Sequence, residues 1–193
     1  MSDTGSRPAG PELWLVRHGE TEWSRDGRHT STTDLPLTDV GEQAATALTD
    51  RLAEVEFDLV LTSPRQRARR TAELAGFPDA EVDEDLVEWG YGDYEGVSTA
   101  EIRETVPGWT VWTHPTPGGE SAEDVSARLD RVVERARRHE RTLVFAHGHS
   151  LRVLTARWLD QPAAHGRFFK LDTSTVSVLG FERETPVLLK WNS

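Results

Sequence analysis

The sequence of 193 residues contains no cysteine, which excludes disulfides and thiolate metal sites and fits a reducing compartment. No apolar run approaches the roughly 20 residues that a membrane-spanning helix needs. Residues 1–11 are polar and lack the basic and apolar regions of a signal peptide. We therefore expect a soluble, cytoplasmic protein with a flexible N-terminal tail over residues 1–11 and a single domain over residues 12–193.

Positive charge is also scarce, because the formal net charge is −11 and Lys170 and Lys190 are the only lysines. This balance argues against nucleic acid or an anionic membrane as the main partner. Hydrophobic residues make up 36% and charged residues 28%, as in a globular chain. We expect a small-molecule partner, which needs a locally basic pocket if it is an anion; a homodimer is left open.

Short apolar runs that are typical of buried strands alternate with segments of helical periodicity. The predicted strands are 13–16, 57–61, 82–87, 142–146 and a terminal hairpin of 175–181 with 187–191. The predicted helices begin after residues 38 and 63 and cover 98–106, 122–139 and 150–159, whereas 21–36 and 107–119 are predicted to be irregular. This order predicts one α/β domain, a three-layer sandwich whose mostly parallel sheet has helices on both faces.

Two of the predicted helices have recognisable start signals. Thr38 is a plausible N-cap, and Gly41 and Glu42 would lie in the first turn. Ser63 followed by Pro64 predicts a second start, with the serine as N-cap and the proline at the first helical position.

Two predicted strands end in the same unusual way. Leu13–Val16 is followed by Arg17, His18 and Gly19, and Leu143–Ala146 is followed by His147 and Gly148. Ligands bind at the carboxyl ends of strands in open α/β sheets. Core packing does not explain two histidine–glycine pairs at equivalent strand ends, so we infer a shared site.

The run Arg17–Thr21 together with His147-Gly148 resembles the histidine phosphatase superfamily, which includes cofactor-dependent phosphoglycerate mutases and many phosphatases. The resemblance covers residues from about 13 to 181 and implies a phosphoglycerate mutase-like fold. It also implies that His18 attacks phosphorus and forms a phosphohistidine, with Arg17 on the same phosphate. A neutral imidazole needs no metal for this step, so we expect neither metal nor cofactor.

The segment Thr62–Ala72 resembles the Ser-Pro-x-x-Arg-Ala-x-x-Thr-Ala signature of the same family. The resemblance makes Arg67 a phosphate ligand, and its place near a helix start also favours an anion. By the same resemblance, His147 hydrogen-bonds the transferred phosphoryl group beside His18.

The segment Leu86–Gly96 resembles the Leu-x-Glu-x-x-x-Gly-x-x-Glu-Gly pattern of the phosphatase branches. The resemblance makes Glu88 the proton donor to the leaving oxygen, and then the base for the water that hydrolyses the intermediate. Glu95 is expected to be solvated or to support the loop. The mutases typically have Leu-Asn-Glu-Arg-His-Tyr-Gly here and longer chains, so both departures favour a phosphatase.

Weaker candidates surround this set. Residues 28–38 match the phosphate-side loop of the family, although Ser31 stands where glycine is usual and Ser24 where many members have asparagine. Hydroxyls still donate to phosphate oxygens. The predicted substrate-binding residues are therefore Ser24, Thr30, Ser31, Gly148 and His149, the last with a structural role as an equal alternative.

A finer resemblance points to the sedoheptulose bisphosphatase branch, on the segments 21–24, 89–96 and 146–149. It implies a sugar phosphate or bisphosphate. Basic candidates for a second phosphate, not assignable by spacing, are Arg28, His29, Arg103 and His114.

The leading prediction is a metal-independent phosphomonoesterase that acts on a small phosphorylated metabolite through phospho-His18. The first alternative is a cofactor-dependent phosphoglycerate mutase. The second, from another functional class, is a non-catalytic phospho-ligand-binding protein, which the presence of all five motif residues disfavours. Those residues are Arg17, His18, Arg67, Glu88 and His147.

Overall fold

The computed structural model describes residues 10–193. The predicted tail over residues 1–11 therefore lies almost wholly outside the described residues, and the first strand begins at Glu12. Among the residues that are described, no helix has the length and apolar character that a membrane crossing requires.

One sheet of six strands forms the centre of the molecule, in the order β3-β2-β4-β1-β5-β6. Its strands are β1 (Glu12–Arg17), β2 (Leu59–Thr62), β3 (Glu81–Val82), β4 (Arg141–Ala146), β5 (Val176–Glu182) and β6 (Thr185–Lys190). The pairs β1–β4, β2–β4 and β2–β3 are parallel. β5 is antiparallel to β1 and to β6, so the predicted terminal hairpin is confirmed.

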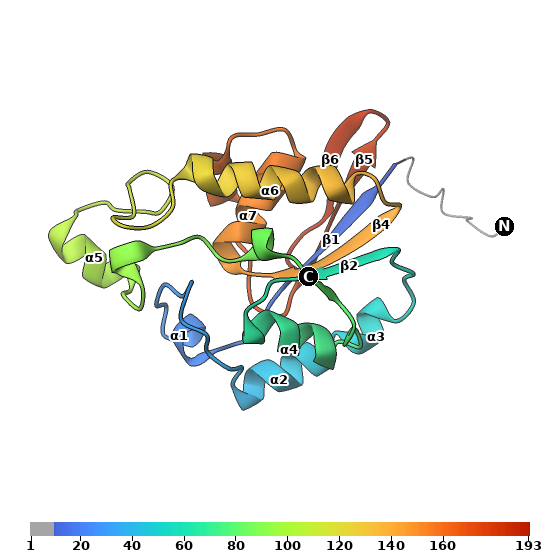
Figure 1. Cartoon of the computed structure of the whole chain (residues 1–193), viewed down its shortest axis with the longest axis horizontal. Helices are drawn as coiled ribbons and strands as arrows, with labels where there is room; N and C mark the ends of the chain where they lie inside the picture. The colour runs from blue at the N-terminus through green and yellow to red at the C-terminus, as the bar shows by residue number, and fades with distance from the viewer. Residues whose placement is uncertain (1–9) are drawn as a thin grey trace.

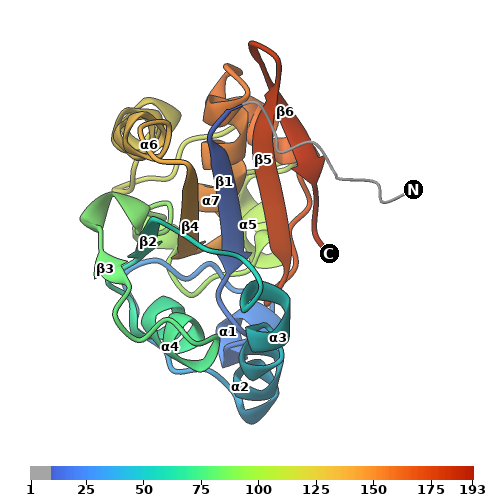
Figure 2. The same cartoon turned by 90° about the vertical axis from the view of Figure 1, so that its right-hand side faces the viewer.

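Helices cover both faces of the sheet, which confirms the predicted three-layer α/β fold. α6 and α7 lie on one face, and α2, α3 and α4 lie on the other (Figures 1 and 2). The α-helices are α1 (Glu22–Arg25), α2 (Asp39–Thr46), α3 (Thr49–Leu52), α4 (Gln66–Leu74), α5 (Thr99–Thr105), α6 (Ala122–Ala136) and α7 (Gly148–Trp158). Short 3₁₀ turns cover Glu84–Leu86, Gly92–Tyr94 and Ala163–Phe168.

Strand β4 shows how the sequence builds two cores. Its side chains alternate, so Leu143 and Phe145 pack into one cluster while Val144 and Ala146 pack into the other. The first cluster includes the helix residues Leu52 and Ala72, and the second includes Leu129 and Leu151. A strand that is apolar on both faces is typical of a sheet covered by helices on both sides.

The carboxyl ends of β1 and β4 coincide. Arg17 is in register with Ala146, and the backbone N–H of His18 donates to the carbonyl of Ala146 at 2.9 Å. His18 and His147 therefore leave neighbouring strands side by side. α5 and the irregular chain between it and α6 lie beyond these ends (Figure 1).

The predicted start of α4 is wrong. The helix begins at Gln66 with Arg65 as N-cap, and the hydroxyl of Ser63 is 3.4 Å from the nearest backbone N–H, that of Arg65. The Ser63 hydroxyl makes a shorter contact of 2.7 Å with Nε2 of His147. This hydrogen bond to a residue far along the chain replaces the expected helix cap. The other start is confirmed, because Thr38 accepts from the N–H of Gly41 at 3.0 Å.

Two further segments differ from the prediction. Of the predicted strand over 82–87, only Val82 lies in a strand, the short β3, since the side chain of Asp83 accepts from the N–H of Asp85 and starts a 3₁₀ turn. The predicted loop after Thr21 contains the single turn α1, which a capping box between Thr21 and Ser24 closes.

Candidate active site

A cavity of about 210 Å³ opens at the carboxyl ends of β1 and β4. This volume is small beside the roughly 300 Å³ and more that drug-sized ligands occupy. The site therefore suits a small ligand. The lining residues are Arg17, His18, Ser24, Gly27, Arg28, His29, Thr30, Glu88, Tyr91, Thr99, Gly148, His149, Arg152 and Leu171.

His18 presents one free ring nitrogen to this cavity. Its Nδ1 is 2.7 Å from the carbonyl of Gly19, and because a carbonyl only accepts, Nδ1 carries the proton and donates. Burial, with Arg67 and Arg17 nearby, holds the pKa of His18 well below its usual value, so the ring is neutral. Nε2 therefore carries a lone pair, and it has no partner among the described residues and is not sealed off from solvent.

His147 lies beside His18, with ring centroids 5.2 Å apart, but both of its ring nitrogens are engaged. Nε of Arg67 donates to Nδ1 of His147 at 3.2 Å, so Nε2 carries the proton and donates to the hydroxyl of Ser63. Burial and the charge of Arg67 lower the pKa of His147 well below its usual value. The ring is fully buried and does not line the cavity, and its contact with the phosphoryl group stays a prediction.

Only part of the Arg17 guanidinium has a hydrogen-bond partner among the described residues. Nη1 donates to the carbonyl of Leu171 at 2.6 Å, while Nε is buried without a partner among the described residues. Gly148 lies beside this guanidinium, and a Cβ there would meet its Cζ and Nε at van der Waals distance, 3.4 Å. The arginine and the glycine both line the cavity, and their contact with a phosphate stays a prediction.

Arg67 lies beneath the cavity and does not line it. Besides His147, it donates to the carbonyls of Thr30, Ser31 and Thr33 at 3.2, 3.4 and 3.0 Å. Arg67 thus joins the second histidine to the phosphate-side loop.

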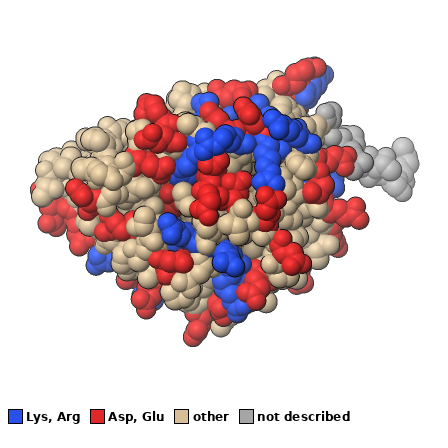
Figure 3. Space-filling view, viewed as in Figure 1, with Lys and Arg blue, Asp and Glu red and all other residues tan. Residues whose placement is uncertain are grey.

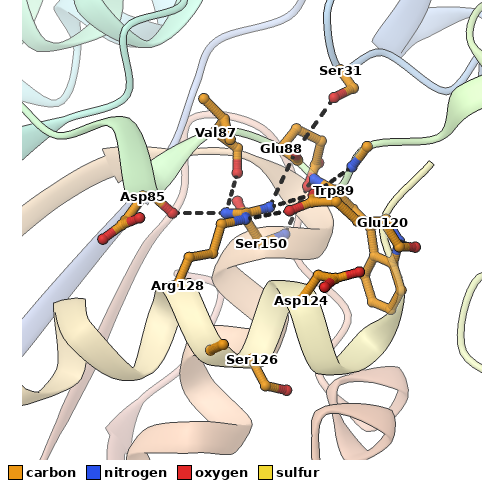
Figure 4. A network of polar contacts seen from close by, with 12 residues as sticks. Ser31, Asp85, Val87, Glu88, Trp89, Glu120, Asp124, Ser126, Arg128 and Ser150 are labelled. Carbon is orange, nitrogen blue, oxygen red and sulfur yellow. Dashed lines mark hydrogen bonds and ion pairs between the residues drawn. The ribbon is translucent and has the colours of Figure 1, made fainter.

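Glu95 holds the same loop from its other edge. Its carboxylate accepts from the backbone N–H groups of Ser31 and Thr33 at about 2.9 Å. This agrees with the interpretation of Glu95 as a loop support. Ser31 itself is buried and does not line the cavity, and its hydroxyl lies 3.4 Å from the carbonyl of Glu88 (Figure 4).

Ser24 and Thr30 line the cavity, but their hydroxyls donate within their own loops. The Ser24 hydroxyl donates to the carbonyl of Thr21 at 3.0 Å, and that of Thr30 donates to the carbonyl of Arg28 at 3.1 Å. A substrate oxygen would compete with these partners.

The carboxyl group of Glu88 lies at the N-terminus of α7. Its Oε1 accepts from the N–H groups of Trp89 and Ser150 at 2.8 and 2.7 Å, and its Oε2 accepts from the N–H of His149 at 3.0 Å. Two of these donors belong to the first turn of a helix whose dipole favours a carboxylate. The carboxyl lines the cavity with a fixed orientation, next to the residues that follow β4.

Arg128 of α6 holds the backbone on either side of Glu88 (Figure 4). It donates to the carbonyls of Asp85 and Val87 at 2.7 and 2.8 Å and to that of Glu88 at 3.2 Å. Its other partner is Glu120, at 2.8 Å, whose carboxylate also accepts from the N–H of Gly90. This ion pair is largely buried and brackets the proposed acid on both sides.

The cavity is basic although the protein is acidic. Three arginines and one carboxylate line it, whereas on the surface over α6 basic side chains lie among acidic ones (Figure 3). Arg131 pairs there with Asp85, for example. Glu88 is the one acidic residue among those that line the cavity, and Glu101, 3.9 Å from Arg28, lies outside the lining. The three arginines therefore make the pocket locally basic.

Sequence reasoning missed three residues of this region: Tyr91, Arg128 and Arg152. Arg152 lies four residues after Gly148, one helical turn along α7, and its guanidinium lies 4.7 Å from the ring of Trp112. Arg128 could have been found in the sequence, because it is a charged residue on the apolar face of the amphipathic helix α6. Of the four candidates for a second phosphate, Arg28 and His29 line the cavity and Arg103 and His114 do not.

The sequence and the fold are similar to those of known phosphatases and mutases. Residues 13–193 match the family described as the Histidine phosphatase superfamily (branch 1). An acid phosphatase of Mycobacterium tuberculosis is 45% identical over 175 residues, which cover 88% of this chain and 86% of that protein. The sedoheptulose 1,7-bisphosphatase of Saccharomyces cerevisiae is 36% identical, covering 77% of this chain and 67% of its own.

Mutases also match: a 2,3-bisphosphoglycerate-dependent phosphoglycerate mutase of a Methylobacterium species is 39% identical, over 74% of this chain and 77% of its own. Among solved structures, the product of an open reading frame of Mycobacterium tuberculosis aligns with a TM-score of 0.90 and 41% identity, covering 94% of this chain and 97% of that one. These likenesses agree with the predicted family and fold.

Proposed function

The chain belongs to the histidine phosphatase superfamily, and we propose that it is a metal-independent phosphomonoesterase that works through a phosphohistidine on His18. One observation carries the proposal: the neutral His18 ring has Nδ1 committed to Gly19 and a lone pair on Nε2 that is open to a basic cavity. Of the two ring nitrogens of His18, only Nε2 is free to form a bond to phosphorus.

The reaction then has two steps that balance. Nε2 of His18 bonds to phosphorus as the ester P–O bond breaks, and protonated Glu88 gives its proton to the departing alkoxide. The carboxylate that remains on Glu88 is stabilised by the N–H groups of Trp89, His149 and Ser150. Water then attacks the phosphohistidine and gives a proton to Glu88, the N–P bond breaks, and inorganic phosphate leaves. Arg17 binds the phosphoryl oxygens throughout, since a guanidinium matches their geometry.

We propose that Arg67 and His147 act from below this centre. Their mutual hydrogen bond and the contacts of Arg67 with the phosphate-side loop keep a positive charge close to the phosphoryl group. Charge on the three phosphoryl oxygens is what catalysis has to stabilise in phosphoryl transfer.

The proposed substrate is a small phosphorylated metabolite, a sugar phosphate or bisphosphate. The cavity is small, and Arg28 and Arg152 add cationic groups to Arg17, which suits a ligand with more than one anionic group. Two relatives are named for acid phosphatase and sedoheptulose bisphosphatase activity. A single domain over residues 12–193 and a cytoplasmic location belong to the same proposal.

The test is phosphate release from a panel of phosphorylated metabolites that includes sedoheptulose and fructose bisphosphates and 3-phosphoglycerate, with a chelator present. The expected result is chelator-resistant release that the His18→Ala variant loses. Release that persists in the variant, or that the chelator abolishes, contradicts the mechanism.

Phosphoglycerate mutase activity is the competing proposal, because mutases at 39% identity are among the relatives. The panel separates the two. Isomerisation of 3-phosphoglycerate without free phosphate favours the mutase, and phosphate release without isomerisation favours the phosphatase. Binding of phosphate esters without either reaction would favour the non-catalytic alternative.

A further inference from the structure

His29 and His149 form a nearly parallel pair of rings in the wall of the cavity. Their centroids lie 6.2 Å apart with an interplanar angle of 12°. Tyr91 packs edge-on against both rings, and Trp112 packs against that of His149. Neither histidine belongs to the proposed reaction described above.

The hydrogen bonds of His29 fix its tautomer. Nδ1 lies 2.6 Å from the carbonyl of Val97, which only accepts, so Nδ1 carries the proton. Burial lowers the pKa of His29 below its usual value, so the ring is neutral and Nε2 carries a lone pair. That nitrogen is an acceptor and cannot donate.

The opposite tautomer holds for His149. Its Nδ1 lies 2.5 Å from the hydroxyl of Tyr91, and burial raises the pKa of this phenol well above its usual value, so the hydroxyl is protonated. No other described group accepts from the Tyr91 hydroxyl, and a buried donor without an acceptor is costly. Tyr91 therefore donates to Nδ1, and Nε2 of His149 carries the proton.

Both Nε2 atoms are available to a ligand. Neither has a hydrogen-bond partner among the described residues, neither is sealed from solvent, and both rings line the cavity. Burial and the charge of Arg152 lower the pKa of His149 well below its usual value, so this ring is neutral as well. The pair thus offers one neutral acceptor and one neutral donor.

This combination does not suit a phosphate, whose oxygens at neutral pH mainly accept and would be repelled by the lone pair of His29. It suits a hydroxyl group, which both donates and accepts. We propose that His29 and His149 bind hydroxyl groups on the part of the substrate that is not transferred, so that the enzyme selects phosphate esters of sugars or polyols. This inference rests on the proposed phosphatase function and adds a specificity site to it.

Tyr91 is a positioning residue for His149. It does not need to touch the substrate, because its hydroxyl acts by keeping the proton of His149 on Nε2. Removing that hydroxyl frees Nδ1 to carry the proton, and the donor that faces the substrate is then lost in part of the molecules.

The test compares two esters with the same number of carbons, glycerol 3-phosphate and n-propyl phosphate. The ratio of their kcat/KM values cancels the amount of folded enzyme. In the native protein we expect glycerol 3-phosphate to be preferred, and we expect His29→Phe and His149→Phe each to lower the ratio about 3- to 10-fold. Tyr91→Phe should lower it less, about 2- to 3-fold. The control is His114→Phe, which lies outside the cavity and should leave the ratio unchanged.

Two failures are distinguishable. Hydrolysis of p-nitrophenyl phosphate that depends on His18 tests the phosphatase proposal itself, and its absence overturns both proposals. If that hydrolysis is present but the native protein does not prefer glycerol 3-phosphate, or if His29→Phe and His149→Phe slow both esters equally, the hydroxyl site is overturned alone.

Discussion

His18 and His147 follow neighbouring parallel strands, each precedes a glycine, and burial keeps each ring neutral. Their hydrogen bonds differ completely. One ring nitrogen of His18 is hydrogen-bonded to Gly19 and the other is open to the cavity. In His147 both ring nitrogens are hydrogen-bonded, one to Arg67 and one to Ser63. The same histidine–glycine pair thus supplies the proposed nucleophile in one place and a hydrogen-bonded support in the other. The partners that each ring finds across the fold make the difference.

The distinction extends to the arginines. Arg17 and Arg152 line the cavity, and each contributes only part of its guanidinium to protein carbonyls. Arg67 and Arg128 lie deeper and are committed to backbone carbonyls, to His147 and to Glu120. Arg17 and Arg152 therefore form an open layer that faces the cavity, and Arg67 and Arg128 form a closed layer beneath it.

The largest expected effect comes from the open histidine. His18→Ala should lower kcat for phosphate release by about 10⁴-fold or more, because the nucleophile is lost. Ser63→Ala removes only the acceptor of His147 and should cost about tenfold. Single-turnover and steady-state assays of both variants test the contrast, and equal losses would contradict it.

The next effect concerns the acid. Glu88→Gln cannot transfer a proton, so kcat for alkyl phosphates should fall about 10²- to 10⁴-fold. Loss for p-nitrophenyl phosphate should be much smaller, since its leaving group needs little protonation. Glu123→Gln in the exposed first turn of α6 is the control. A loss that is the same for both leaving groups would show that Glu88 does not supply the proton.

A smaller effect tests the closed layer. Arg128→Met leaves the carboxylate of Glu120 without its partner, and should lower the free energy of unfolding by about 3 kcal/mol. Arg131→Met on the same helix removes an exposed ion pair, and should cost about 1 kcal/mol or less. Urea denaturation measures both. Among molecules that remain folded, Arg128→Met should lower kcat more than it raises KM, because it displaces Glu88. Equal stabilities of the two variants would contradict the structural role of the Arg128–Glu120 ion pair.

The last effect is a pH dependence of stability. Burial lowers the pKa of His18, His147 and His149, so the unfolded chain binds more protons than the folded one below about pH 6.5. The free energy of unfolding should therefore fall as the pH falls, by up to about 1.4 kcal/mol per pH unit for each histidine.

Urea denaturation between pH 7.5 and 5.5 measures this slope. His149→Phe removes one of the buried groups and should make the slope shallower than in the native protein. His114→Phe, outside the cavity, serves as the comparison. Equal slopes in the two variants would contradict the assignment of a depressed pKa to His149.

Local patterns predicted the scaffold well. Apolar runs located β1 and β4, the amphipathic stripe located α6, and family motifs located the residues that the fold brings together around His18 and Glu88. These signals succeed because strand and helix periodicity are properties of neighbouring residues.

Contacts between distant residues were not predictable in this way. Ser63 followed the pattern of a helix cap, yet its hydroxyl serves His147, 84 positions away. Arg128 reaches the carbonyls near Glu88 across 40 positions, and Tyr91 sets the tautomer of His149 across 58. Such partners depend on the packing of α6 and α7 against the sheet, which no local pattern contains.

The most direct measurement is to quench the enzyme during turnover and to locate the phosphoryl group by peptide mass spectrometry under alkaline conditions, where phosphohistidine survives. We expect a phosphorylated peptide that contains His18 in the native protein, and no phosphorylated peptide from this region in the His18→Ala variant. A phosphoryl group on His147 instead, or turnover with no phosphorylated histidine at any quench time, would contradict the assignment of the open ring as the nucleophile.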